Sequence, residues 1–300
     1  MTLLDKAITG LLPTVPRPLV RRLASPYIAG PGLEDAMRVV GELNAAGKLA
    51  TVDVLGEEIT RPEETREIVA QYHRLLARID AERLDANISV KLTGLGLGLD
   101  LALCRDNLEG LVADAAVRGN FVRIDMEDAS TTEETLRLYA ALRADGHENL
   151  GVVLQARLRR SLTDVPGLAN VRLCKGIYLE PPAIAYTDPA EIRANFLAEL
   201  DALLDQGSYL AIATHDEFLI AEALARVARR GLAPDRYEFQ MLLGVRAARG
   251  AEIVAAGHRL RVYVPFGSHW YEYSVRRLQE NPRIAVYVAS DLARRLAGGR

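Results

Sequence analysis

Residues 87–126 read NISVKLTGLGLGLDLALCRDNLEGLVADAAVRGNFVRIDM, and this stretch decides the predicted fold. A short apolar run at 87–93 is followed by residues 101–118, whose apolar positions recur with helical spacing, and then by a second short apolar run at 121–126. The short runs are nearly continuous rather than alternating, which is typical of parallel strands whose outer face is covered. The stretch therefore predicts a strand–helix–strand unit.

The same alternation continues along the chain in both directions. Eight short runs are candidate strands, at 49–56, 87–93, 121–126, 151–155, 171–176, 209–214, 236–242 and 260–267. The stretches with helical periodicity lie at 62–80, 101–118, 132–145, 188–206, 217–230, 244–256 and 270–280. Eight units in roughly 250 residues predict a (β/α)8 TIM-type barrel. A doubly wound open sheet is the alternative, but residues 55–58 do not form the glycine-rich phosphate turn that such sheets usually carry after the first strand.

Residues 1–47 precede the first strand and contain about three helical segments broken by prolines. We interpret them as an N-terminal helical extension of the same domain, with the barrel at 48–300. Within this extension, residues 17–23 are basic and amphipathic. They could dock on an anionic membrane or pack on the barrel as a cap, and their short length favours the cap.

Composition excludes several classes of protein. The 300 residues are 49% hydrophobic and 26% charged, with a net charge of −3, which argues against a dedicated nucleic-acid binder. No run approaches the roughly 18 apolar residues that span a bilayer, and the N-terminus lacks a secretory pattern. Cys104 and Cys174 lie too far apart in sequence for a metal knuckle and suit a reducing compartment. We expect a cytoplasmic enzyme.

Polar residues follow most of the predicted strands, where a barrel places its chemistry. A single such residue is more often a solvated charge or a structural ion pair, but six of the eight strands end this way, and burying so many without a ligand is costly. These residues are Asp53, Glu57, Lys91, Asp125, Glu127, Asp128, Gln155, Arg157, Arg172, Lys175, Tyr178, Thr214, His215, Glu238, Gln240 and Tyr263. Only His215 and His269 lie near strand ends, so no metal site is expected.

The segment after the last strand has an unusual face. Tyr273, Arg276, Arg277 and Glu280 are spaced i, i+3, i+4 and i+7, so they share one side of a helix. Two adjacent guanidiniums suit a carboxylate or a phosphate. The alternative is a solvated face with an Arg277–Glu280 pair.

Seven strings of this chain resemble the proline dehydrogenase family, in its monofunctional bacterial form. The closing Tyr-x-x-Arg-Arg-x-x-Glu pattern is the most specific of them, and the matches run in order from about residue 30 to 285. They are VLGE (54–57), SVKLT (89–93), IDME (124–127), VRLCKGIY (171–178), ATH (213–215), YVPFG (263–267) and YSVRRLQEN (273–281).

The resemblance implies a flavoprotein that oxidises L-proline to Δ1-pyrroline-5-carboxylate, transfers a hydride from proline C5 to N5 of FAD, and passes electrons to a quinone. It implies that Asp125, Arg172 and Tyr263 act at the reacting centre. Substrate contacts are expected from Lys91, Leu173, Tyr178, Tyr273, Arg276 and Arg277, with Glu57 closing the site. FAD contacts are expected from Met126, Gln155, Arg172, Lys175, Gly176, Ile177, Thr214, His215 and Glu280. Asp216 stands where the bifunctional relatives are expected to have Asn.

Two other functions remain open on the residues alone. Lys91 or Lys175 could serve a Schiff-base aldolase or lyase, with Arg276 and Arg277 binding a substrate phosphate or carboxylate. A binding protein with the same pocket and no turnover is the second alternative. The location is expected to be cytoplasmic, with contact to the inner face of the membrane if residues 17–23 dock there.

Overall fold

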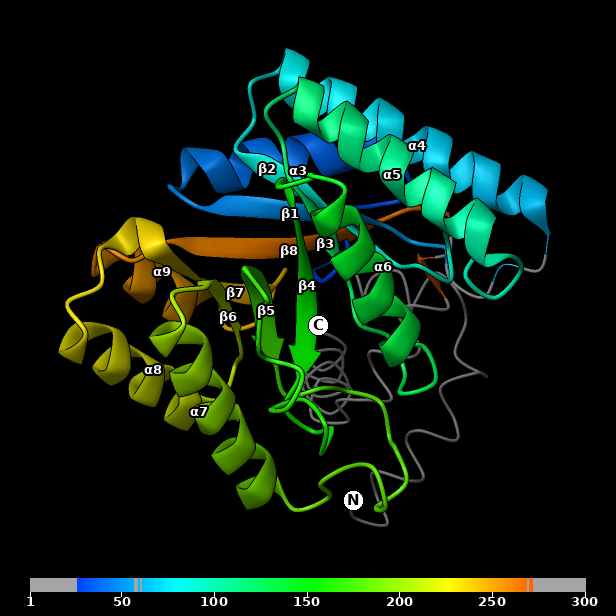
Figure 1. Ribbon diagram of the computed structural model, residues 1–300. Coiled ribbons are helices and arrows are strands. Elements are labelled where there is room, and N and C mark those ends of the chain that lie inside the picture. Colours follow the sequence, from blue (N-terminus) through cyan, green and yellow to red (C-terminus); the bar gives the residue numbers. More distant parts are fainter. Residues whose placement is uncertain (1–25, 57–58, 60, 269, 272–300) are drawn as a thin grey trace, which may run out of the picture.

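A computed structural model describes residues 26–56, 59, 61–268 and 270–271 of the chain. Eight parallel strands form a closed barrel in sequence order, and β8 pairs with β1 (Figure 1). The strands are β1 (Leu49–Val54), β2 (Ala86–Val90), β3 (Val122–Ile124), β4 (Leu150–Gln155), β5 (Asn170–Cys174), β6 (Tyr209–Ala213), β7 (Tyr237–Leu242) and β8 (Leu260–Phe266). The predicted TIM-type barrel is confirmed, and the open-sheet alternative is wrong.

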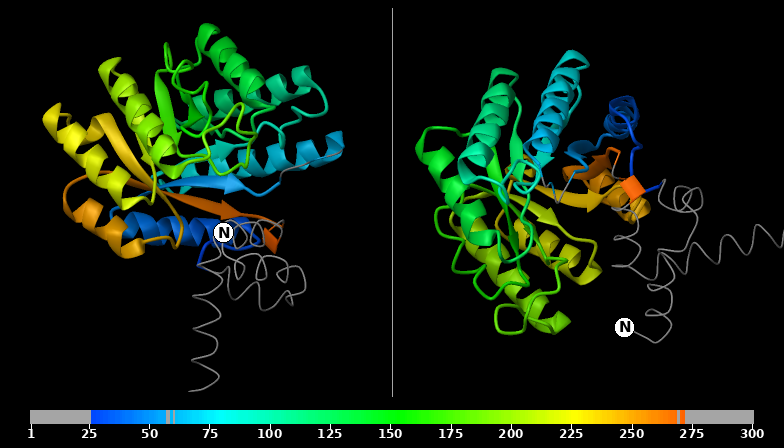
Figure 2. Two further views of the ribbon diagram at one scale, coloured as in Figure 1. Left: turned by 90° about the horizontal axis from the view of Figure 1, so that it is seen from below. Right: turned by 90° about the vertical axis from the view of Figure 1, so that its right-hand side faces the viewer.

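Helices surround the barrel on its outer side (Figure 2). They are α3 (Leu33–Ala45), α4 (Pro62–Ala81), α5 (Leu101–Val117), α6 (Thr132–Ala144), α7 (Pro189–Asp205), α8 (Glu217–Arg229) and α9 (Ala247–Ala255), with a short 3₁₀ helix at Pro234–Arg236. Helix α7 begins as expected, because the Asp188 side chain accepts a hydrogen bond from the Ala190 amide and Pro189 is the first helical residue.

No helix lies between β4 and β5, and the sequence has no helical pattern there. The segment 156–169 instead forms turns that contact the loop after β5 through a bridge between Leu158 and Ala185. These two loops therefore support each other at one rim of the barrel.

Helix α3 precedes the barrel and packs against both β1 and β8 (Figure 1). Its buried face consists of Ala36, Met37 and Val40. The backbone before it is tied to the same place, since the Ala29 amide donates to the Pro265 carbonyl at 3.0 Å. Residues 1–25, which include the basic segment 17–23, lie outside the described residues.

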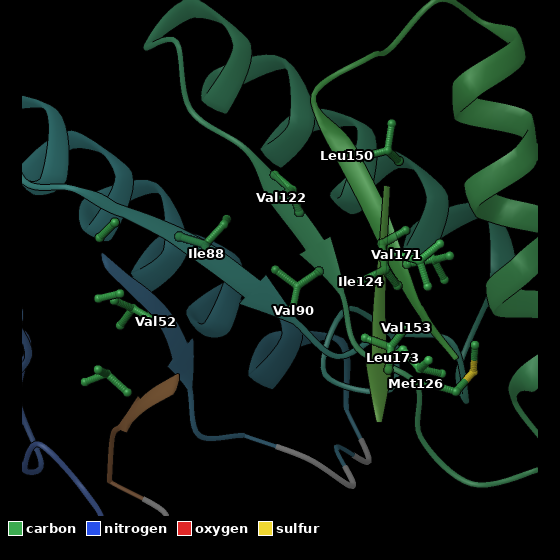
Figure 3. Close-up of a cluster of buried hydrophobic side chains, with 14 of the residues drawn as sticks. Val52, Ile88, Val90, Val122, Ile124, Met126, Leu150, Val153, Val171 and Leu173 are labelled. Atoms are coloured by element: carbon green, nitrogen blue, oxygen red, sulfur yellow. The ribbon is translucent and has the colours of Figure 1, made fainter. Parts of the chain in front are cut away.

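Strand alternation divides the core into an apolar layer and a polar lumen. Residues such as Val52, Ile88, Ile124 and Leu173 are fully buried in the hydrophobic core (Figure 3). Each contributes on the order of 2 kcal/mol relative to exposure.

The positions next to these residues point into the lumen and are polar and buried: Asp53, Ser89, Arg123, Asp125, Arg172, Glu238 and Gln240. Gly151 leaves room for one of them, because a Cβ there would lie 2.4 Å from Nη1 of Arg123. Burial lowers the pKa of Arg123 to about 9. The barrel interior is therefore built around charges, which need internal partners.

Candidate active site at the carboxyl ends of the strands

A cavity of about 630 Å³ opens at the carboxyl ends of the strands. Seven of the eight strands contribute to its lining, either from their last residues or from the loops that follow. The lining residues are Lys91, Asp125, Met126, Val153, Gln155, Arg172, Cys174, Lys175, Gly176, Ile177, Tyr178, Ala213, Thr214, His215, Asp216, Gln240, Met241, Leu242 and Tyr263. This is the end of a barrel at which enzymes of this fold carry out their chemistry.

The Asp125 carboxylate is the centre of the first hydrogen-bond network. Its Oδ1 accepts hydrogen bonds from Ser89 Oγ at 2.7 Å and from Arg172 Nη1. Its Oδ2 accepts from Tyr263 Oη at 2.8 Å and lies 3.9 Å from Lys91 Nζ. Four side chains from three strands, β2 with its end, β5 and β8, therefore fix one carboxylate.

The second network is built on the fully buried Asp53. Lys91 Nζ lies 2.7 Å from Asp53 Oδ2 and also donates to Tyr263 Oη at 3.3 Å. Tyr72 Oη lies 3.2 Å from Asp53 Oδ1 and accepts from the Val54 amide. Burial raises the pKa of Tyr72 well above its ordinary value, and the nearby Asp53 charge adds to this, so Tyr72 stays protonated.

Among the residues that the structure describes, the charges of the two networks balance. The cations Lys91 and Arg172 face the carboxylates Asp53 and Asp125 in two ion pairs. A low-dielectric site of this kind holds its charges only when they are paired. A ligand with no net charge, such as a zwitterion, fits such a balance.

The Arg172 guanidinium donates hydrogen bonds from Nε and Nη1, while its second amino group, Nη2, donates none to the described residues. Its Nε donates to Gln240 Oε1 at 2.6 Å, and its Nη1 contacts Asp125 and Ser89. Its Nη2 is buried and has no hydrogen-bond partner among the described residues. Because an unsatisfied buried donor is unfavourable, this atom marks a position where a bound molecule can accept a hydrogen bond.

The wall between β4 and β5 is shaped by Gly176. Gly176 has a φ of +90°, and a Cβ there would lie 2.8 Å from Oε1 of Gln155. Gln155 is itself fixed, because its Nε2 donates to the Glu127 carbonyl at 2.7 Å. Glycine is thus required both by the backbone angle and by the approach of Gln155.

His215 is oriented by backbone groups of the next βα unit. Its Nε2 accepts a hydrogen bond from the Leu242 amide at 3.0 Å, and its carbonyl accepts from Arg246 Nη1 at 2.8 Å. An acceptor at Nε2 assigns the proton of the neutral ring to Nδ1.

Asp216 connects the start of α8 with two cations. It accepts from the Phe218 amide as the N-cap, from Lys175 Nζ at 3.1 Å, and from Arg193 Nε at 2.8 Å. Burial alone would raise the pKa of Asp216, but the hydrogen bonds from Arg193 and Lys175 outweigh it and lower that pKa. Asp216 is therefore a charged wall residue, which an asparagine at this position would not be.

The structure brings together most of the site residues expected from the sequence. Those that line the cavity are Lys91, Asp125, Met126, Gln155, Arg172, Lys175, Gly176, Ile177, Tyr178, Thr214, His215 and Tyr263. Leu173 does not line it, because it lies on the opposite face of β5 from Arg172 and is fully buried in the core (Figure 3). The expected Glu57, Tyr273, Arg276, Arg277 and Glu280 lie outside the described residues.

Ser89 and Cys174 were not expected at the site, and Gln240 was expected only as one of the polar strand residues, with no role assigned. Ser89 and Gln240 both contact Arg172, and Cys174 lines the cavity. Ser89 occupies an inward position of β2, two residues from Lys91, so strand alternation was the signal that could have identified it. Burial raises the pKa of Cys174 to about 11, which favours its thiol form over the nucleophilic thiolate at neutral pH.

Within the described part of the chain, no three His, Cys, Asp or Glu residues are grouped so that they could hold a metal ion. No helix among the described residues is both long and apolar enough to cross a membrane.

A closed parallel barrel whose strand ends direct charged residues into one cavity defines a (β/α)8-barrel enzyme. The sequence model named proline dehydrogenase matches residues 36–289. The chain is 35% identical over 273 residues to proline dehydrogenase 1 of Bacillus subtilis subsp. natto, with 90% of each chain covered. It is 36% identical over 278 residues to a proline dehydrogenase of Deinococcus radiodurans, again with 90% of each covered. The chain therefore belongs to the proline dehydrogenase family of oxidoreductases, and the resemblance is confirmed.

Solved structures agree with this fold. Proline utilization A from Bdellovibrio bacteriovorus, inactivated by N-propargylglycine, matches with a TM-score of 0.82 and 25% identity over 91% of this chain. The protein of the same name from Corynebacterium freiburgense matches with a TM-score of 0.76 and 23% identity over 95% of this chain. This chain spans 36% and 34% of the length of those two proteins.

Proposed function

We propose that this chain oxidises L-proline to Δ1-pyrroline-5-carboxylate with FAD as its cofactor. The observation that carries the proposal is the convergence of Lys91, Asp125, Arg172 and Tyr263 on one cavity in a chain of this family. Proline is a zwitterion with an apolar ring, and the cavity combines balanced charges with aromatic and apolar walls.

The residues of the cavity fit a flavin. Arg172 offers a buried donor without a partner, Gly176 leaves a cradle that a Cβ would fill, and Gln155, Thr214 and His215 offer fixed polar groups nearby. Lys175, which is paired with Asp216, provides a cation in the cavity lining. Met126, Ile177 and Arg172 complete the proposed contacts. When bound, FAD supplies the acceptor for the hydride that leaves proline C5.

The chain's own residues orient the substrate and hold its charges. Lys91 is the described cation best placed for the proline carboxylate, and Tyr263, 5.9 Å from Lys91 Nζ to ring centroid, offers a flat wall for the pyrrolidine ring. Tyr178 is the proposed opposite wall. Hydride loss requires a neutral amine, because a protonated nitrogen has no lone pair with which to form the C=N bond.

Substrate binding also needs cations beyond the described ones. Lys91 and Arg172 are each paired with a carboxylate, so they do not supply a net positive charge for a second carboxylate. We propose that Arg276 and Arg277 bind the proline carboxylate, that Tyr273 and Glu57 form the wall around it, and that Glu280 contacts the cofactor. A quinone is the proposed electron acceptor, and a cytoplasmic location with membrane contact stays a prediction.

The test is an absorbance spectrum of the purified protein before and after anaerobic addition of L-proline. We expect a flavin band that bleaches with L-proline and persists with D-proline. A colourless protein that FAD cannot reconstitute would contradict the proposal. Borohydride trapping with carbonyl substrates would then test the lyase alternative, although Lys91 and Lys175 are both ion-paired, which disfavours a nucleophilic amine. A flavin that L-proline cannot reduce would point to the binding-protein alternative.

A further inference from the structure

Gln240 lies on β7, lines the cavity and is 4% exposed. Its Oε1 accepts the hydrogen bond from Arg172 Nε at 2.6 Å, while its Nε2 donates to Glu238 Oε1. Both ends of the amide therefore have hydrogen-bond partners: the oxygen accepts from Arg172, and the nitrogen donates to Glu238.

The carboxylate of Glu238 decides which way this amide points. If the amide were reversed, its NH2 group would face Arg172 Nε–H and its carbonyl would face a carboxylate, so both contacts would be repulsive. Arg261 keeps Glu238 ionised by a two-point ion pair, from Nε to Oε1 at 2.8 Å and to Oε2 at 3.0 Å. Burial acts to raise the pKa of Glu238, but the Arg261 charge and its hydrogen bonds lower that pKa.

A continuous chain of contacts thus runs from Arg261 on β8 through Glu238 and Gln240 to Arg172. With Nε held by Gln240 and Nη1 held by Asp125, the planar guanidinium can no longer rotate. Its remaining amino group, Nη2, is buried and unpartnered among the described residues. The chain of contacts therefore reserves one donor of Arg172 for a ligand.

We propose that Gln240 is a positioning residue: it fixes the Arg172 guanidinium so that Nη2 faces the bound cofactor. This inference rests on the proposed function. A donor that is oriented before the reaction stabilises developing negative charge without reorganisation, so its loss lowers turnover more than substrate affinity.

The test compares Gln240→Leu with Gln206→Leu. Gln206, the C-cap of α7, is an exposed glutamine whose amide also donates hydrogen bonds, to Val165, Leu168 and Ser208, but it does not line the cavity. In Gln240→Leu we expect kcat with L-proline to fall about 10- to 100-fold with little change in KM. We also expect a more negative reduction potential of the bound flavin. Gln206→Leu controls for destabilisation and should change neither quantity.

A second variant keeps the inference testable if Gln240→Leu does not fold. Gln240→Glu combined with Glu238→Gln exchanges the two side chains: position 240 still accepts from Arg172 Nε, and the hydrogen bond between positions 238 and 240 is kept with its donor and acceptor exchanged. This double variant should retain kcat within about threefold of the wild type. Gln240→Glu alone places two carboxylates together and should lower the reduction potential. The inference is overturned if kcat and potential are unchanged in Gln240→Leu, or if Gln206→Leu alters them equally. A wild-type flavin that L-proline cannot reduce would refute the proposed function instead.

Discussion

The phenol of Tyr263 on β8 donates a hydrogen bond to Oδ2 of Asp125, 2.8 Å away at the end of β3. The same hydroxyl accepts from Lys91, and the ring lies 5.3 Å from the Arg172 guanidinium. One side chain therefore contacts both of the ion pairs that line the cavity. The ring contributes packing and the hydroxyl contributes hydrogen bonds, and a substitution that removes only the hydroxyl can tell the two apart.

Tyr263→Phe keeps the ring and removes the hydroxyl. Asp125 loses one donor and Lys91 one acceptor, a cost of about 1–1.5 kcal/mol that corresponds to about a tenfold fall in kcat/KM for L-proline. FAD content should be unchanged, because the ring wall persists. Steady-state kinetics and the flavin absorbance check both quantities. Tyr186→Phe, at a tyrosine that does not line the cavity, is the control, and unchanged kinetics in Tyr263→Phe would limit Tyr263 to packing.

Arg276→Lys tests the proposed carboxylate contact. Lysine keeps the charge but loses the planar fork, so the KM for L-proline should rise about tenfold or more, while FAD content stays near that of the wild type. Arg137→Lys on the exposed side of α6 is the matched control. A KM equal to that of the wild type would remove Arg276 from the substrate site.

Gly176→Ala separates backbone strain from crowding at Gln155. Gly146 has a similar φ of +95°, but a Cβ there meets nothing within 4 Å, so Gly146→Ala reports strain alone. Both variants should lose about 1 kcal/mol of unfolding free energy. Only Gly176→Ala should also bind FAD more weakly, because its Cβ displaces Gln155. Thermal unfolding and FAD titration measure the two effects. Equal FAD affinity in both variants would contradict the proposal that FAD binding requires the space left by Gly176.

Glu199 makes the stability of the fold depend on pH. It is fully buried on α7, where Ser161 Oγ and Asn195 Nδ2 donate to its Oε1. Burial raises its pKa from 4.5 to about 8. The folded state therefore holds a proton that the unfolded state releases above pH 4.5. Stability from the neutral form is complete below pH 4.5 and is lost as the pH rises to about 8.

Denaturation of Glu199→Gln across this range measures the effect. Relative to Glu199→Gln, the wild type should lose about 1.4 kcal/mol of unfolding free energy per pH unit between pH 4.5 and 8. Glu191→Gln, exposed in the first turn of the same helix, should run parallel to the wild type. A constant difference between wild type and Glu199→Gln would show that Glu199 titrates normally.

The barrel could be predicted because its signal is local. Each strand is a short apolar run, and each helix shows the apolar spacing of an α-helix. Eight repeats of this strand–helix unit are compatible with few folds. The cavity residues at strand ends could also be predicted from the sequence, because a parallel barrel brings the carboxyl ends of all its strands together. Leu173 was expected at the site because it lies in a string that resembles the family, between two residues that line the cavity, but Leu173 itself does not line it.

The partners of these residues could not be predicted. Lys91 pairs with Asp53 and Lys175 with Asp216, and both pairs join residues about 40 positions apart in the chain. Such pairings depend on strand register and on side-chain rotamers, which a local pattern does not contain. The same holds for Gln240, an uncharged residue whose role appears only when Glu238 and Arg172 are seen on either side of it.

The pairing of β1 with β8 has a consequence for synthesis on the ribosome. Leu49 is in register with Arg261, and Arg261 Nη1 donates to the Ala50 carbonyl at 2.7 Å, so closure joins segments more than 200 residues apart. Until β8 has emerged from the ribosome, β1 and β7 remain open edges that other chains can pair with. Such late, non-local closure is slow and exposes the nascent chain to aggregation. Chaperone protection matters most in the interval before residue 266 becomes available.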